Sequence, residues 1–224
     1  MTTAAAVPSL AALVESLAAE GVLGESWRAV FLAVPREVFI PEVIWREAGD
    51  DLMSLRRCDE PAEWLRRVYG PHYVVTQVDD GNPAGPDGRG RVATSSASRP
   101  DIVALMLEAG RVEPGMRVLE IGTGTGYTAA LLAERLGAGN VTTIEVDPQL
   151  AERARVALRT VGYGEVTVII GDGTRGYPEG RRSIGCCPPW PHPRCLIRGS
   201  HTRVPVGWWS PPGTALTSPP GCCR

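Results

Sequence analysis

Residues 117–126 read Arg-Val-Leu-Glu-Ile-Gly-Thr-Gly-Thr-Gly, a short apolar strand that runs directly into a glycine-rich turn. The pattern that follows predicts a helix over residues 127–136. Glycines let the backbone turn tightly and approach a ligand closely, because no Cβ atom interferes. A strand, such a turn and a helix in this order are typical of a ligand-binding crevice in an open α/β sheet.

Strands and helices continue to alternate along the chain. Residues 141–146 and 166–170 are rich in β-branched residues and predict two more strands, with a helix over residues 149–161 between them. Pro100 is suited to begin a helix ahead of the first strand. This order predicts an α/β fold, a parallel sheet with right-handed crossovers and flanking helices.

Small and acidic residues follow each predicted strand, at the sheet edge where ligands bind in this class of fold. Glu145 ends the second strand, and its carboxylate is suited to accept hydrogen bonds from two ribose hydroxyls. Asp172 follows the third strand and is suited to accept from an adenine amino group or a backbone N–H. The candidate cofactor-binding residues are Gly122, Thr123, Gly124, Thr125, Gly126, Glu145, Asp172 and Gly173.

Each of these positions also has a purely structural interpretation. The glycines can form a tight turn without a ligand, Glu145 can be a solvated strand-end acid, and Asp172 can simply form a turn. A dinucleotide site would require a third glycine at position 127, where this chain has Tyr127. The glycine turn, Glu145 and Asp172 fall in register along the predicted sheet, which favours a shared binding site over three separate structural roles. The missing third glycine argues against a dinucleotide as the ligand of that site.

Three segments resemble the protein-L-isoaspartate O-methyltransferases, a family of class I S-adenosylmethionine-dependent methyltransferases. They are residues 117–126, 144–148 and 171–178, the last reading Gly-Asp-Gly-Thr-Arg-Gly-Tyr-Pro. Residues 34–41 are similar to the family's early V-P-R-x-x-F-x-P segment, and the resemblance spans roughly residues 10–180. It implies a Rossmann-like methyltransferase fold, S-adenosyl-L-methionine as the cofactor, and carboxyl methylation of L-isoaspartyl residues in protein repair.

The resemblance also implies an active-site hydroxyl. Residues 95–100 read Ser-Ser-Ala-Ser-Arg-Pro where the family has Q-T-I-S-x-P, and alignment on the proline places Ser98 on the family's catalytic serine. A carboxylate is already nucleophilic at neutral pH, so we expect catalysis from positioning and desolvation. Ser98 can also be interpreted as the N-cap of the helix near Pro100, and the two roles are compatible.

Two departures from the family leave the acceptor open. The loop within residues 74–93 is longer than the family's, and Ser95 and Ser96 replace a Gln-Thr pair. Relatives that methylate Asp in ribosomally made peptides have loops similar to residues 75–81. An Asp of such a precursor peptide is therefore the alternative acceptor. A module that binds the cofactor without catalysis is the alternative of another class.

The composition divides the chain near residue 180. Residues 1–180 hold 17 arginines and 25 acidic residues, a net charge of −8, whereas residues 181–224 hold six arginines and no acid. We expect residues 1–93 to form a segment of helices and loops that includes the substrate-side loop. Residues 94–180 are expected to form the cofactor-binding α/β core, and residues 181–224 an aberrant tail.

The tail is best interpreted as the product of a shifted reading frame. Codons that begin one base earlier can convert residues 181–184 to Ala-Pro-Phe-Asp, which continues the family pattern. Taken as written, the chain would be truncated and would lack the sheet's fourth strand, and we expect it to be poorly folded or inactive. A zinc site, a disulfide-rich appendage and a disordered tail are the alternatives. The possible zinc ligands match no standard spacing, so no metal is expected; they are Cys186, Cys187, His192, Cys195 and His201.

The bulk composition excludes several classes of partner. The formal net charge of −2 argues against a basic nucleic-acid-binding surface. No apolar run reaches the roughly 18 residues of a membrane span, and the first eight residues lack the basic region of a secretory signal. We expect a cytoplasmic monomer whose partner is a peptide or protein with an isoaspartyl or aspartyl carboxylate.

Overall fold

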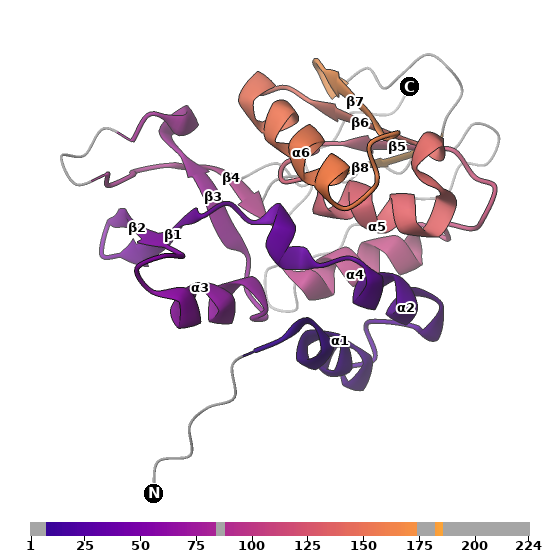
Figure 1. Ribbon diagram of the computed structural model, residues 1–224, viewed down its shortest axis with the longest axis horizontal. Coiled ribbons are helices and arrows are strands. Elements are labelled where there is room, and N and C mark those ends of the chain that lie inside the picture. Colours follow the sequence, from indigo (N-terminus) through magenta and orange to yellow (C-terminus); the bar gives the residue numbers. More distant parts are fainter. Residues whose placement is uncertain (1–7, 84–87, 174–181, 186–224) are drawn as a thin grey trace, which may run out of the picture.

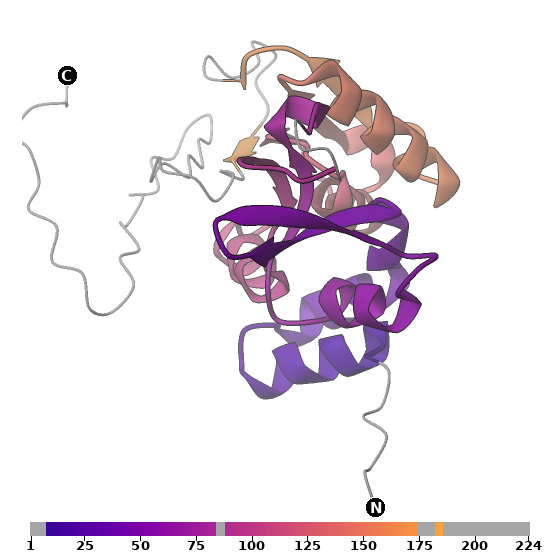
Figure 2. The same cartoon turned by 90° about the vertical axis from the view of Figure 1, so that its left-hand side faces the viewer.

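The computed structural model describes residues 8–83, 88–173 and 182–185, and these residues form two four-stranded sheets with helices packed around them (Figure 1). One sheet is parallel, with strand order β7-β6-β5-β8, and the other is antiparallel, with order β2-β1-β3-β4. The two sheets lie beside each other as separate layers (Figures 1 and 2). No helix in the described part of the chain is long and apolar enough to cross a membrane.

The parallel sheet confirms the predicted strands and helices. Its strands are β5 (Val118–Ile121), β6 (Val141–Glu145), β7 (Thr167–Ile170) and β8 (Arg182–Gly185). The helices α5 (Tyr127–Leu136) and α6 (Pro148–Thr160) connect the first three strands, and η3 (Ala138–Asn140) precedes β6. β6 and β7 lie on one side of β5 and β8 on the other, so a crevice is expected at the carboxyl end of β5.

The prediction that the fourth strand is missing was wrong. Residues 182–185 pair in parallel with β5, from Val118↔Arg182 to Ile121↔Gly185. The physical reason is that a ladder is made by backbone groups, so an unusual side-chain composition does not prevent pairing with an open strand edge. The sheet therefore continues past residue 180. The other predictions for the tail, including the possible zinc ligands, concern residues outside the described ones.

The larger apolar core lies between the parallel sheet and a helical layer. The N-terminal segment contributes the helices α1 (Leu10–Ala19) and α2 (Glu25–Ala33), and α4 (Pro100–Ala109) begins at the predicted proline. α1 buries Leu13, Val14 and Leu17, spaced for one helix face. α2 packs on α5, and Arg135 of α5 donates hydrogen bonds to the carbonyls of Ser26 and Val112.

The prediction of only helices and loops before residue 94 was incomplete. The structure adds β1 (Val43–Ala48), β2 (Asp51–Arg56), β3 (Val74–Val78) and β4 (Ala93–Ala97), with α3 (Pro61–Val68), η1 (Arg36–Phe39) and η2 (Asp79–Gly81). β3 is buried on both faces, so its sequence does not alternate between apolar and polar residues. The alternation that identifies a half-buried strand is therefore missing from it. The two-residue loop Gly49-Asp50 between β1 and β2 was the available hairpin signal.

This sheet has an apolar core of its own. Trp64 of α3 is fully buried against Ile44, Leu55 and Val74, and its indole N–H donates to the Pro41 carbonyl at 3.1 Å. The indole nitrogen is thus satisfied, as a buried tryptophan requires.

We expect Leu131→Ala to lower the free energy of unfolding by about 2–5 kcal/mol, because Leu131 of α5 is fully buried in the larger core and truncation leaves a cavity. Leu105→Ala in α4 is the matched control, since its side chain is 43% exposed and its loss is expected to change stability by about 0.5 kcal/mol or less. Urea unfolding of both variants measures the difference. Equal losses would contradict this assignment of the core.

Candidate functional site

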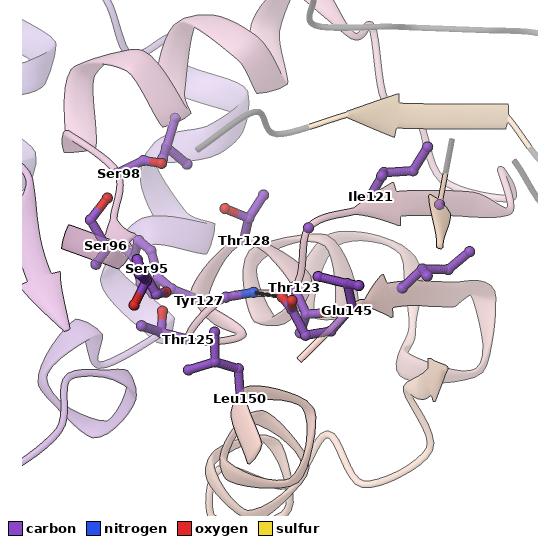
Figure 3. A pocket seen from close by; sticks show the side chains of 18 of the residues that line it. Ser95, Ser96, Ser98, Ile121, Thr123, Thr125, Tyr127, Thr128, Glu145 and Leu150 are labelled. Carbon is purple, nitrogen blue, oxygen red and sulfur yellow. Dashed lines mark hydrogen bonds between the residues drawn. The ribbon is translucent and has the colours of Figure 1, made fainter. Parts of the chain in front are cut away.

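A pocket of about 360 Å³ opens where the parallel sheet meets the end of the antiparallel sheet (Figure 3). The carboxyl ends of β5 and β6 form one side, and the segment from Thr94 to Ser98 forms the other. The serines of this segment lie across the pocket from Glu145 (Figure 3). Most of the candidate residues are brought together here: Ser98, Gly122, Thr123, Gly124, Thr125, Glu145, Asp172 and Gly173.

The glycine turn after β5 is shaped by left-handed backbone conformations. Gly124 has φ +54°, and a Cβ atom there would meet no protein atom within 4 Å, so its absence leaves open space beside the pocket. Gly126 does not line the pocket. With φ +88° it is the N-cap of α5, and a Cβ atom would lie only 3.2 Å from the Cβ of Ala154, so this glycine permits close packing of α5 on α6.

Glu145 is held in place by backbone groups at the end of β6. Its Oε2 accepts from the Gly124 N–H at 2.8 Å, and its Oε1 accepts from the Asp147 N–H at 3.1 Å. The side chain is only 7% exposed. Each carboxylate oxygen has a second lone pair, so Glu145 can still accept two hydrogen bonds from a ligand diol. A solvated strand-end acid would show neither the burial nor the fixed geometry.

A second carboxyl group, Glu120, lies buried beneath the turn. Its Oε2 accepts from the Thr143 hydroxyl at 2.7 Å, and the Thr143 and Thr123 hydroxyls are 2.6 Å apart. Burial raises the pKa of Glu120 to about 8, aided by the nearby Glu145 and opposed by the Thr143 hydrogen bond. Glu120 is therefore largely protonated at neutral pH. It lies two positions before Gly122, the first glycine of the turn, but no role was predicted for it from the sequence.

Ser98 lies half-buried between β4 and α4, and its position depends on Arg36. The fully buried Arg36 guanidinium donates to the carbonyls of Ser98 and Val68, both at 2.9 Å, and lies 4.9 Å from the ring centre of Tyr127. Burial lowers the pKa of Arg36 and raises the pKa of Tyr127 to about 12. Arg36 lies in the segment that resembled the family, but its link to Ser98 was not predicted.

The alternative interpretation of Ser98 as a helix cap was wrong. The N-cap of α4 is Arg99, and the side chain of this residue makes no capping hydrogen bond. Asp101 in the first turn instead pairs with Arg99 at 2.6 Å and accepts from the Ile102 N–H at 2.8 Å. The Ser98 hydroxyl therefore has no capping role, and its residue lines the pocket.

Asp172 and Gly173 lie where the chain leaves β7, at the edge of the pocket. Asp172 is exposed, whereas Gly173 is buried beside Ile121. In the described part of the chain, no group of three or more His, Cys, Asp or Glu side chains is placed to hold a metal ion.

We expect Glu120→Gln to remove a pH dependence of stability. The folded carboxyl keeps its proton up to about pH 8, whereas the unfolded one loses it near 4.5. Between these values the folded state binds more protons, so this group lowers the wild-type free energy of unfolding by about 1.4 kcal/mol for each pH unit of increase. The variant should therefore gain on the wild type from pH 5 to pH 8 in urea unfolding.

The exposed Glu113 supplies the control, because Glu113→Gln is expected to differ from the wild type by a constant amount over the same range. A constant difference for Glu120→Gln as well would show that its pKa is not raised.

Comparison with known proteins identifies relatives along most of the chain. The family model described as protein-L-isoaspartate(D-aspartate) O-methyltransferase matches residues 86–181. The protein-L-isoaspartate O-methyltransferase of Ignicoccus hospitalis is 35% identical, and the match covers 86% of this chain and 72% of the relative. The corresponding protein of Methanothermobacter thermautotrophicus is also 35% identical, with 87% and 78% covered.

Solved structures agree with this result. A protein-L-isoaspartate O-methyltransferase matches with a TM-score of 0.54 at 25% identity over 77% of this chain, which spans about half (53%) of that protein's length. A putative protein-L-isoaspartate O-methyltransferase from Plasmodium falciparum, solved with S-adenosyl-L-homocysteine, matches with a TM-score of 0.53 and covers 76% of this chain and 66% of its own; at 17% identity it shows the shared fold alone. On the sequence relatives, the chain belongs to the protein-L-isoaspartate O-methyltransferase family, a family of class I methyltransferases.

Proposed function

We propose that this chain transfers a methyl group from S-adenosyl-L-methionine to a free carboxylate of a peptide or protein, with L-isoaspartyl residues as acceptors. The observation that carries the proposal is the pocket in which Glu145 and the glycine turn lie opposite Ser98. The relatives, which are named for this reaction, support it. We further propose that the protein acts in the cytoplasm as a monomer.

The residues that line the cofactor side fit this cofactor. Glu145 presents two fixed carboxylate oxygens to a ribose diol, and the open space at Gly124 allows close approach of a ligand. Ile144 and Leu150 are suited to apolar contact with an adenine ring. Asp172, at the pocket edge, is suited to accept a hydrogen bond from the adenine amino group. When bound, S-adenosyl-L-methionine supplies an electrophilic methyl carbon on a sulfonium.

The acceptor side needs no general base. A carboxylate with a pKa of about 4 is already ionised at neutral pH, so its oxygen is the nucleophile. The Ser98 hydroxyl is suited to donate a hydrogen bond to one carboxylate oxygen and to orient the other toward the methyl group. Ser96 and Ser98 are only partly exposed, so a bound acceptor would lose part of its contact with water on this side of the pocket.

In this proposal the two parts of the chain have different roles. Residues 94–180, extended by β8, hold the cofactor, and the segment before residue 94 supplies the acceptor side through Arg36 and the β3–β4 connection. The length of that connection keeps an Asp residue of a ribosomally made precursor peptide as the second candidate acceptor.

We expect Glu145→Ala to raise the Kd for S-adenosyl-L-homocysteine at least tenfold, because it removes a charged acceptor from a buried site and releases the Gly124 N–H. Isothermal titration calorimetry measures this, with Glu113→Ala as a control that removes an exposed glutamate outside the pocket. An unchanged Kd for Glu145→Ala would overturn the assignment of the cofactor site.

We expect Ser98→Ala to lower the rate of methyl transfer to a synthetic L-isoaspartyl peptide by about tenfold to a hundredfold, because it removes one hydrogen bond to a charged group. The Kd for S-adenosyl-L-homocysteine should stay within about twofold. Ser26→Ala, on the exposed face of α2, is the matched control and should be fully active.

The same assay with an Asp-containing precursor peptide separates the two acceptors. Faster transfer to that peptide would favour the specialised role over protein repair. Cofactor binding without transfer to either peptide would contradict the proposed activity and leave a binding module.

A further inference from the structure

Gln77 connects the two sheets through a buried amide. Its side chain is only 2% exposed, although it lies in β3 of the antiparallel sheet. Its Nε2 donates to Asp147 Oδ2 at 2.8 Å, across 70 positions of sequence. Its Oε1 accepts from the Thr94 hydroxyl at 2.9 Å. Both ends of the amide are therefore used, one on each side of the junction between the sheets.

An irregularity in the strand pairing accounts for this direction of the side chain. The register of β3 against β4 shifts on both sides of Gln77, between Val75 and Gln77 and again between Gln77 and Val78. Such bulges redirect a side chain away from the regular alternation of a strand. The bulge thus turns Gln77 toward the start of α6.

From Asp147 the hydrogen bonds continue to the cofactor side of the pocket. The Asp147 N–H donates to Glu145 Oε1 at 3.1 Å, and Glu145 Oε2 accepts from Gly124. Asp147 also caps α6, with its Oδ1 accepting from the N–H groups of Gln149 at 2.7 Å and Leu150 at 3.3 Å. Burial alone would raise the pKa of Asp147, but the hydrogen bonds from Gln77 and from the helix start outweigh it and lower the pKa.

From Thr94 the hydrogen bonds continue into the connection between β3 and β4. The Thr94 hydroxyl accepts from the Asp80 N–H at 3.1 Å while it donates to Gln77. The neighbouring Asp79 carboxylate accepts from the N–H groups of Arg91 at 3.0 Å and Val92 at 2.9 Å. Asp79 and Asp80 have φ near +50°, a conformation that these contacts hold in place. Gln77 is therefore bonded to both the connection and the cofactor side.

We propose that Gln77 is a positioning residue, which joins the β3–β4 connection to the Glu145 carboxylate through Asp147 and so sets the affinity for the cofactor. The inference rests on the proposed function for the identity of the ligand. Because coupling between two sites is reciprocal, an acceptor that binds against Asp80 or Thr94 and stabilises this arrangement would also tighten cofactor binding.

A reciprocal exchange of chemical groups tests the proposal. Gln77→Glu replaces the amide donor by a second carboxylate, so two carboxylates face each other where Gln77 Nε2 and Asp147 Oδ2 are now 2.8 Å apart. Asp147→Asn either points its amide N–H groups at those of Gln77 or turns its oxygen away from the start of α6, which removes the cap. In the double variant, the new amide at position 147 can donate to the new carboxylate at position 77 while the amide oxygen still caps α6. That carboxylate can still accept from the Thr94 hydroxyl, so the hydrogen-bond pattern is restored with its polarity reversed.

We expect each single variant to raise the Kd for S-adenosyl-L-homocysteine about tenfold or more, and the double variant to return to within about threefold of the wild type. Calorimetry gives the three values. In the methylation assay, KM for the cofactor should follow the same pattern while kcat at saturating cofactor changes by less than about twofold. A merely structural residue would lower the fraction of active protein, and hence kcat, instead.

Ser26→Glu is the control for charge, because it adds the same negative charge on an exposed side chain of α2, outside this network, and should leave the Kd within about twofold. Unchanged affinity in the single variants, or a double variant as weak as the two losses combined, would overturn the proposal. If one single variant fails to fold, the Kd of the double variant still tests the proposal, because a value more than about threefold above that of the wild type would overturn it. A wild-type chain that does not bind S-adenosyl-L-homocysteine would instead refute the proposed function.

Discussion

The hydrogen bond from the Gly124 N–H to the Glu145 carboxylate joins the turn after β5 to the end of β6, and the geometry of the site depends on it. β5 and β6 pair in parallel from Val118↔Val141 to Ile121↔Ile144, so their carboxyl ends lie at the same edge of the sheet. The hydroxyls of Thr123 and Thr143 support the turn from the interior. The carboxylate is thus oriented before any ligand arrives, which reduces the side-chain entropy lost on binding.

The two sheets are joined at the site by polar contacts, while each keeps its own apolar core. Arg36 and Gln77 are both buried, and each uses its polar atoms to reach across to the other layer or to the segment that carries Ser98. Burying such groups is costly unless their hydrogen bonds are made, so only a narrow range of arrangements is stable. Arg36 thereby restrains the backbone at Ser98, and Gln77 restrains the start of α6 beside Glu145.

β8 completes the environment of the central strand. With β6 on one side and β8 on the other, β5 has no open edge, and the order of the strands reverses at β5. In α/β sheets a crevice forms at such a reversal because the neighbouring connections leave in opposite directions. The pocket lies at this point, so the pairing of residues 182–185 belongs to the structural basis of the site even though their composition differs from that of the preceding chain.

By itself the sequence determined the strands and helices between residues 100 and 170 and most residues of the cofactor side, because apolar periods, Pro100 and the glycine turn act within a few residues of each other. Tertiary structure alone decided the antiparallel sheet, in which Trp45 meets Val75 and β3 is buried without alternation. It also decided that Gly126 serves helix packing and that the buried Arg36 and Gln77 donate hydrogen bonds to Ser98 and Asp147. Such partners lie far apart in the chain, and only the packing of the whole molecule brings them within hydrogen-bond distance.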